Sequence, residues 1–132
     1  MTKWASNLAE AVLRHQFAEH NWDELVGELT EGVDELQSAF KNARSKKTLF
    51  ANFGEHNIEV KDDRNRILSF AITDGVIAMS CSWRPSMRFT FTSPSMSVLS
   101  PLPGESFPGF PPHSQVLITS VIEASVKELF KI

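Results

Sequence analysis

The dipeptide Asp74-Gly75 constrains the fold of this chain more than any other local feature. It stands between two short segments rich in apolar and β-branched residues, "LSFAIT" and "VIAMSC". Asp-Gly is typical of a two-residue type I′ turn, which matches the right-handed twist of two antiparallel strands. The turn also fixes a register, in which Phe70 faces Met79. The sequence therefore predicts a β-hairpin over residues 66–83.

The two faces of this predicted hairpin differ in side-chain size. Successive residues of a strand point to opposite faces, so alternation along the sequence sorts side chains between them. The large apolar side chains share one face: Leu68, Phe70, Ile72, Ile77, Met79, Cys81 and Trp83. The small or hydroxylated side chains share the other: Ser69, Ala71, Thr73, Val76, Ala78, Ser80 and Ser82. We expect helices to cover the large face.

The alternation continues on both sides of the hairpin. A turn at residues 63–65 joins it to a preceding strand, and a loop at residues 84–86, which would pair Met79 with Phe91, joins it to a following one. Both connections keep the large side chains on one face, and such consistency is expected of a real sheet. We predict strands at 56–62, 66–73, 76–83 and 87–93, a fifth at 48–53 and a sixth at 95–99.

Helical spacing replaces this alternation at both ends of the chain. Residues 3–18 and 21–40 each carry an apolar stripe with three- and four-residue spacing. Asn21 followed by Glu24 is typical of a capping box at a helix start. We therefore expect two N-terminal helices that form a hairpin. A last helix is expected over residues 114–131.

A proline-rich segment separates the predicted sheet from the last helix. Residues 100–112 hold five of the seven prolines of the chain. Proline lacks a backbone N–H and fixes φ, so this segment continues neither a strand nor a helix. The predicted fold class is α+β in one domain of 132 residues. It consists of an N-terminal helical hairpin, an antiparallel meander of four to six strands with helices on one face, a Pro-rich crossover and a C-terminal helix.

The small face of the sheet is a candidate partner surface, because its centre carries almost no charge. Two interpretations stay open. Antiparallel sheets commonly have one solvated face, and a flat uncharged face is also suited to a second copy of the chain. On the second interpretation the protein is a homodimer. The contact residues would include Ser69, Thr73, Ser80, Ser82, Thr90 and Thr92.

An acidic tract is a second candidate surface. Between Arg14 and Lys41 the chain has seven carboxylates and neither lysine nor arginine. Four of them line one side of the predicted second helix: Glu24, Glu28, Glu31 and Glu35. Their mutual repulsion would be relieved by a basic protein partner. The alternative is an exposed helix face that keeps the protein soluble.

Two further functions fit the pattern. A small apolar ligand could be carried between the sheet and the C-terminal helix, with the Pro-rich segment as a lid. Its contact residues would be Phe70, Met79, Trp83, Phe89, Phe91, Phe107 and Phe110. An acidic inhibitor or immunity-type protein, which occupies a basic site on its target, is the other alternative.

Catalytic and metal chemistry find little support. Cys81 lies on the large face, where a buried thiol behaves as a small hydrophobe. Neither G-x-S-x-G nor a Gly-rich phosphate loop is present. His15 and Glu19 are one helical turn apart and could share a metal, but His20 points elsewhere, so a solvated polar edge is the simpler interpretation. We expect no catalytic residue, no metal and no cofactor, although an enzyme stays possible.

The net charge and the composition limit the kinds of partner and the cellular compartment that we expect. The net charge of −3 argues against a general nucleic-acid binder. No apolar run approaches the roughly 18 residues of a membrane span. A single cysteine permits no disulfide within one chain, which favours the cytoplasm. The leading prediction is a non-catalytic, homodimeric protein-binding module in the cytoplasm.

Overall fold

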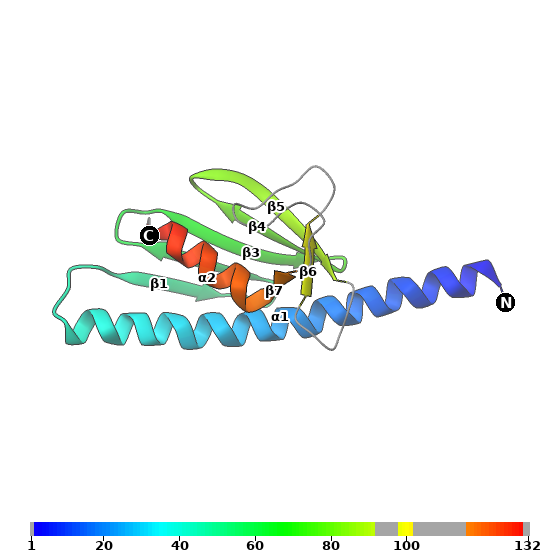
Figure 1. Ribbon diagram of the computed structural model, residues 1–132, viewed down its shortest axis with the longest axis horizontal. Coiled ribbons are helices and arrows are strands. Elements are labelled where there is room, and N and C mark those ends of the chain that lie inside the picture. Colours follow the sequence, from blue (N-terminus) through cyan, green and yellow to red (C-terminus); the bar gives the residue numbers. More distant parts are fainter. Residues whose placement is uncertain (1, 92–97, 102–115, 131–132) are drawn as a thin grey trace.

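The computed structural model, which describes residues 2–91, 98–101 and 116–130, has an α+β architecture (Figure 1). One long helix, α1 (Lys3–Asn42), is followed by a meander of strands, and a second helix lies near the C-terminus. The elements after α1 are β1 (Leu49–Phe53), β2 (Asn57–Asp62), β3 (Ile67–Thr73), β4 (Val76–Cys81), β5 (Arg84–Phe91), β6 (Val98–Pro101), β7 (Val116–Leu117) and α2 (Ile118–Leu129). The predicted fold class is confirmed.

The strands form one antiparallel sheet in which each pairs with its neighbours along the chain. The meander is therefore confirmed, with seven strands in place of the predicted four to six. The additional strand is β7, whose two residues pair with β6. The two residues of β7 lie in the segment that was predicted as the start of the last helix (114–131). In the structure that helix, α2, begins at Ile118. Of the predicted Pro-rich crossover, residues 100 and 101 belong to β6, contrary to the prediction that the segment continues no strand, and residues 102–112 lie outside the described residues.

The central hairpin has the predicted turn and register. Asp74 and Gly75 both have positive φ, 50° and 77°, as a type I′ turn requires. Phe70 lies opposite Met79, and the preceding hairpin pairs Ile58 with Phe70. All three side chains are buried, so the large face is the core face.

The hairpin formed by β4 and β5 differs from its prediction. Met79 pairs with Met87, four residues before the predicted partner Phe91. The turn lies at residues 82–83, and the register shifts between Met79 and Cys81. A shift by an even number of residues keeps the two faces, so Phe91 is still buried. Long-range contacts of Ser82, described below, hold the turn at this place.

The predicted N-terminal helical hairpin is wrong, because α1 is one continuous helix of 40 residues. Asn21 lies in its middle and is fully buried. Its Nδ2 donates a hydrogen bond of 2.8 Å to the carbonyl of Phe17, one turn earlier, instead of capping a new helix. No glycine or proline stands between residues 18 and 26 to interrupt the helix.

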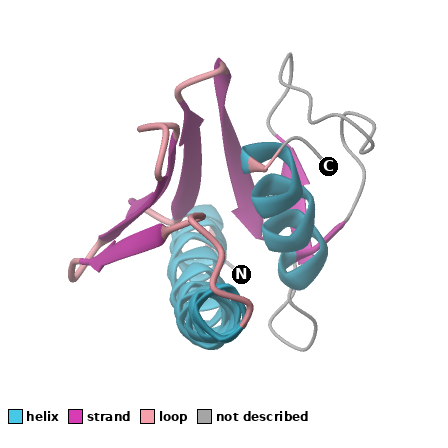
Figure 2. Ribbon diagram, turned by 90° about the vertical axis from the view of Figure 1, so that its left-hand side faces the viewer, coloured by secondary structure: helices cyan, strands magenta, loops and turns pink. Residues whose placement is uncertain are grey.

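Both helices contribute to a core on the large face of the sheet (Figure 2). The cluster combines side chains from α1, such as Leu25 and Leu29, with Val121 and Leu129 of α2. The sheet contributes Leu49, Ile58, Val60, Leu68, Phe70, Ile77, Met79, Met87, Phe89 and Phe91. This packing fixes where α1 lies, and it involves only the part of α1 from Phe17 onwards.

Candidate protein-binding site

The N-terminal end of α1 projects beyond the sheet (Figure 1). We call residues 3–14 the projection; at 1.5 Å per residue it is about 18 Å long. Its large apolar side chains are exposed: 69% of Trp4, 55% of Leu8 and 56% of Val12. These three residues are four apart, so they form one row along the helix. No element among the described residues covers this row.

The same spacing continues into the buried part of α1. Trp4, Leu8, Ala11, His15, Ala18, Trp22, Leu25 and Leu29 follow one another at intervals of three and four residues. From Ala18 onwards this stripe is buried against the sheet, and before it the stripe is open. The β3–β4 turn marks the boundary, since a Cβ at Gly75 would lie 3.5 Å from Cδ2 of His15. The projection begins where the sheet ends.

A groove lies between α1 and α2. It has a volume of about 560 Å³. Its apolar walls come from both helices: Leu29, Gly32, Val33, Leu36 and Ala39 of α1, with Ile122 and Val126 of α2. Three carboxylates, Glu28, Glu35 and Glu123, also line it. An apolar floor with an acidic rim suits an amphipathic segment that carries basic side chains.

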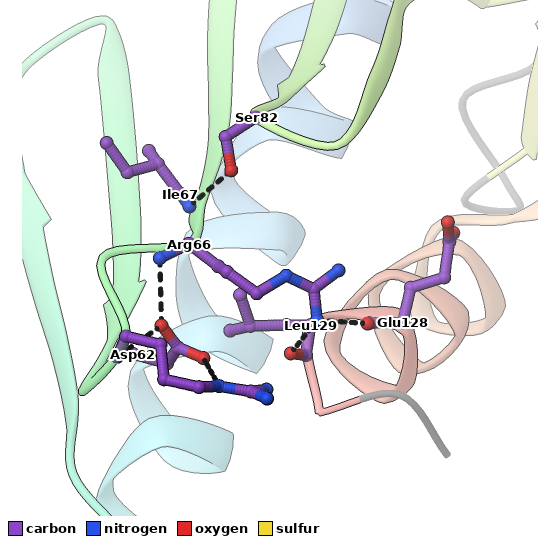
Figure 3. Close-up of polar contacts among 7 residues, drawn as sticks. Asp62, Arg66, Ile67, Ser82, Glu128 and Leu129 are labelled. Atoms are coloured by element: carbon purple, nitrogen blue, oxygen red, sulfur yellow. Dashed lines mark hydrogen bonds and ion pairs between the residues drawn. The ribbon is translucent and has the colours of Figure 1, made fainter.

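The position of α2, and hence the shape of the groove, is fixed at the C-terminal end of that helix (Figure 3). Nη1 of Arg66 donates hydrogen bonds to the carbonyls of Glu128 (3.2 Å) and Leu129 (2.6 Å). A cation at a helix C-terminus is favoured by the helix dipole. The guanidinium also stacks 4.3 Å from the ring centroid of Trp83, whose Nε1 donates to Glu128 Oε1 at 3.0 Å.

The two turns that flank this contact are held by side chains as well (Figure 3). Oδ1 of buried Asp62 accepts from the backbone N–H groups of Arg64 and Arg66 at 3.0 and 2.8 Å. Oγ of Ser82 accepts from the N–H of Ile67 at 3.0 Å. Asp62 Oδ2 lies 3.5 Å from Nε of Arg64, an ion-pair distance. This network is structural, because its groups are aimed at one another.

The predicted partner residues of the small sheet face lie together, as expected from their parity. Thr73, Ser80 and Ser82 are exposed, while Ser69 and Thr90 are half-buried. Thr92 lies outside the described residues. Both described helices pack on the opposite face.

The acidic residues predicted on α1 are all exposed: Glu24, Glu28, Glu31 and Glu35. Glu24 has an ion-pair contact of 3.4 Å with Nε2 of His20, one turn earlier. Glu28 and Glu35 line the groove between α1 and α2. The structure thus places two of these four glutamates at the groove with α2, which the sequence did not reveal.

The side chains predicted to hold an apolar ligand lie mostly in the core. Phe70, Met79, Phe89 and Phe91 are buried, and Trp83 is half-buried. Ser125 of α2 contacts the sulfur of Met79 at 3.1 Å, so helix and sheet are in direct contact there. Phe107 and Phe110 lie outside the described residues.

His15 and Glu19 line a polar cavity of about 400 Å³ near the β3–β4 turn. His56, which is isolated in the sequence, joins them there with Asp23 and Asp74. Over the described ranges, no three His, Cys, Asp or Glu side chains are grouped closely enough to hold a metal ion.

Sequence reasoning missed the two features that define the candidate site. The prediction of two separate stripes, at 3–18 and 21–40, hid that Trp4 stands one turn before Leu8 on a single stripe. The signal was present in the unbroken spacing from Trp4 to Leu29, which crosses the predicted break at Asn21. The groove had no sequence signal, since its walls are about 90 residues apart in the chain.

Comparison with protein-family models, with curated proteins and with solved structures found no match. In the part of the chain that the structure describes, neither helix is both long and apolar enough to cross a membrane. The function is therefore inferred from the residues of this chain.

Proposed function

We propose that this protein is a non-catalytic protein-binding module that binds its partner through the projection of α1. The observation that carries the proposal is the row of Trp4, Leu8 and Val12, which is more than half exposed. Tryptophan and leucine at one turn's spacing are the anchors by which a helix binds an apolar groove. Tryptophan is also enriched among the residues that dominate binding energy.

Helix energetics support the same proposal. A helix of about 12 residues is marginal in water when nothing packs on it, because propagation barely offsets nucleation. The projection gains continuity from the rest of α1, but the large apolar side chains of its row stay more than half exposed. An apolar partner along the row would stabilise it and would remove the exposed side chains from water.

The surfaces predicted from the sequence remain part of the proposal. A homodimer is supported by the small sheet face, which carries few charges, and a basic partner by the exposed carboxylates of α1. A cytoplasmic location is supported by the single cysteine. None of these surfaces exposes large apolar side chains in a row, so the projection is the stronger candidate.

Affinity capture from a lysate of the source cells tests the proposal. The full chain, immobilised through its C-terminus, should retain protein that the Trp4→Ser, Leu8→Ser variant loses. Phe50→Ser is the matched control, because Phe50 is an equally large apolar side chain, 62% exposed, on the sheet. We expect the control to retain what the wild type retains. Equal retention by the wild type and the double variant would contradict the proposal.

A further inference from the structure

We propose that the groove between α1 and α2 is a second binding site of this protein, and that it binds a basic amphipathic helix of another protein. The groove is separate from the projection, so the row of Trp4, Leu8 and Val12 takes no part in it. This inference rests on the basic-partner part of the proposed function, for which it names the surface and the kind of segment that binds there.

The two walls of the groove are held in place before any partner arrives. At the C-terminal ends of the two helices, the rings of Phe40 and Phe130 make an edge-to-face contact with centroids 5.7 Å apart. Arg66 holds the last carbonyls of α2. Leu29 of α1 and Ile122 of α2, which both line the groove, also belong to the core. A partner therefore loses little free energy in ordering this surface.

The floor of the groove has room for apolar side chains. Leu36 of α1 and Val126 of α2 are only half-buried, although both pack against the core. A Cβ at Gly32 would meet nothing within 4 Å. The volume of about 560 Å³ lies within the roughly 300–1,000 Å³ that is typical of binding clefts. Apolar side chains of a partner would complete the burial of Leu36 and Val126.

The length of the groove matches a helical segment. It runs from Glu28 to Ala39 on α1 and from Thr119 to Val126 on α2, which is about 17 Å and about 10 Å at 1.5 Å per residue. A helix that binds a groove uses anchors at i, i+3 or i+4, and i+7, and these span about 10 Å. The anchors of one helix therefore fit along both walls.

The rim of the groove is acidic, which favours a basic partner. Glu28, Glu35 and Glu123 line it, and all three are exposed. Glu123 has an ion-pair contact of 3.2 Å with Lys127 on its own helix. Glu28 and Glu35 have no ion pair within the described parts of the chain, and no lysine or arginine stands within one turn of either along α1. Basic side chains of a partner would complement these two carboxylates.

The spacing of these two carboxylates fits a helix as well. Glu28 and Glu35 are seven residues apart, about 10 Å along α1. Basic side chains at i and i+7 of a partner helix have the same separation. The partner would then lie along α1, with its basic flank towards the α1 rim and its apolar anchors between α1 and α2.

Fluorescence anisotropy with a synthetic peptide tests the inference. The probe is a fluorescein-labelled amphipathic peptide of about 15 residues, with leucines at the anchor positions and lysines beside them, and the full chain is titrated into it. We expect saturable binding with a Kd below about 200 μM. A twin peptide with glutamate in place of every lysine should bind at least about tenfold more weakly. A higher Kd for the basic peptide, or equal binding of its acidic twin, overturns the inference.

A matched pair of glycine variants locates the bound peptide. Gly32→Phe places a large side chain in the groove, whereas Gly27 does not line it, and a Cβ at either position would meet nothing within 4 Å. We expect Gly32→Phe to weaken binding of the basic peptide at least about fivefold and Gly27→Phe to weaken it less than about twofold. Circular dichroism checks that both variants keep their helices. Equal Kd values for the two variants would contradict binding in the groove.

A second matched pair tests the rim and stays decisive if Gly32→Phe disturbs the fold. Glu28→Lys with Glu35→Lys reverses the two rim charges. Glu31→Lys with Asp34→Lys makes the same change in net charge at exposed positions of α1 that do not line the groove. The first pair should weaken binding about five- to twentyfold at low salt, and the second less than about threefold. Equal effects would mean that net charge alone governs binding, against the inference.

The Trp4→Ser, Leu8→Ser variant separates this inference from the binding role of the projection. It should bind the basic peptide within about twofold of the wild type, because the row does not line the groove. Loss of peptide binding in this variant alone assigns the peptide to the projection, which overturns the inference and leaves the proposed function intact. Peptide binding in the groove without any Trp4-dependent capture from the lysate supports the inference and removes the role of the projection.

Discussion

The projection and the part of α1 that packs on the sheet carry apolar side chains at the same spacing but in different surroundings. Leu25 and Leu29 are almost fully buried against the sheet, whereas Leu8 is 55% exposed. The same residue type on the same helix is thus part of the core at one end and part of the surface at the other. The difference shows that an apolar stripe indicates a surface to be covered and does not say what covers it.

The same comparison explains how one helix serves two purposes. The half on the sheet gains its stability from packing, because burial of a leucine side chain is worth roughly 2 kcal/mol. The projection extends a helix that is already nucleated, so it needs no separate nucleation step. It can therefore present side chains to a partner in a fixed geometry, which lowers the entropy lost on binding.

Matched leucine-to-alanine substitutions should give the largest contrast between the halves. Leu29→Ala should lower the free energy of unfolding by about 2–5 kcal/mol, since it removes buried methyl groups and leaves a cavity. Leu8→Ala should change it by less than about 0.5 kcal/mol in a dilute sample, because the side chain is exposed. Urea denaturation at low protein concentration measures both. A loss for Leu8→Ala as large as that for Leu29→Ala would show that the row is covered within one chain.

A second contrast concerns the contact that holds α2 beside α1. Arg66→Met should lower the free energy of unfolding by about 1–3 kcal/mol, because two helix carbonyls lose a charged donor and Trp83 loses its stacked cation. Lys127→Met is the control: both members of its ion pair with Glu123 are exposed, and the loss should stay below about 1 kcal/mol. Thermal unfolding followed by circular dichroism compares them. Equal losses would show that Arg66 does not anchor α2.

The two glycines within α1 give the smallest and most specific contrast. A Cβ at Gly27 or at Gly32 would meet nothing within 4 Å in one chain. Alanine at either site should therefore raise the free energy of unfolding by about 0.5–1 kcal/mol in a dilute sample. Of the two glycines, Gly32 lines the groove between α1 and α2, so Gly32→Ala adds a methyl group to the wall of that groove. Urea denaturation of both variants measures the change, and a loss of stability in either variant would contradict the open surroundings of that position.

The two hairpins on either side of β4 show which features of the sheet a local sequence pattern can predict. Asp74 and Gly75 adopt positive φ within their own turn, so the pairing of Phe70 with Met79 followed from local chemistry. The next turn lies at Ser82 because its side chain accepts from Ile67, 15 residues earlier, and because the neighbouring Trp83 donates to Glu128, 45 residues later. Contacts at such separations leave no signature in the local sequence.

The continuity of α1 through Asn21 was also decided by contacts that the local sequence does not show. Asn21 and Glu24 have the residue types of a capping box, but Asn21 is buried inside α1 and bonds to the carbonyl of Phe17. Local propensity allowed a start at this place, and packing of the surrounding apolar stripe on the sheet favoured continuation. The predicted hairpin of helices failed for this reason.

By itself, the sequence determined the α+β class, the faces of the strands and the apolar stripes, because side-chain periodicity is a local property of helices and strands. Only the tertiary structure decided which part of the stripe on α1 is buried, where the groove with α2 lies, and which carboxylates border it. The physical reason is that burial depends on where the sheet ends, and the position of that end is set by contacts between residues far apart in the chain.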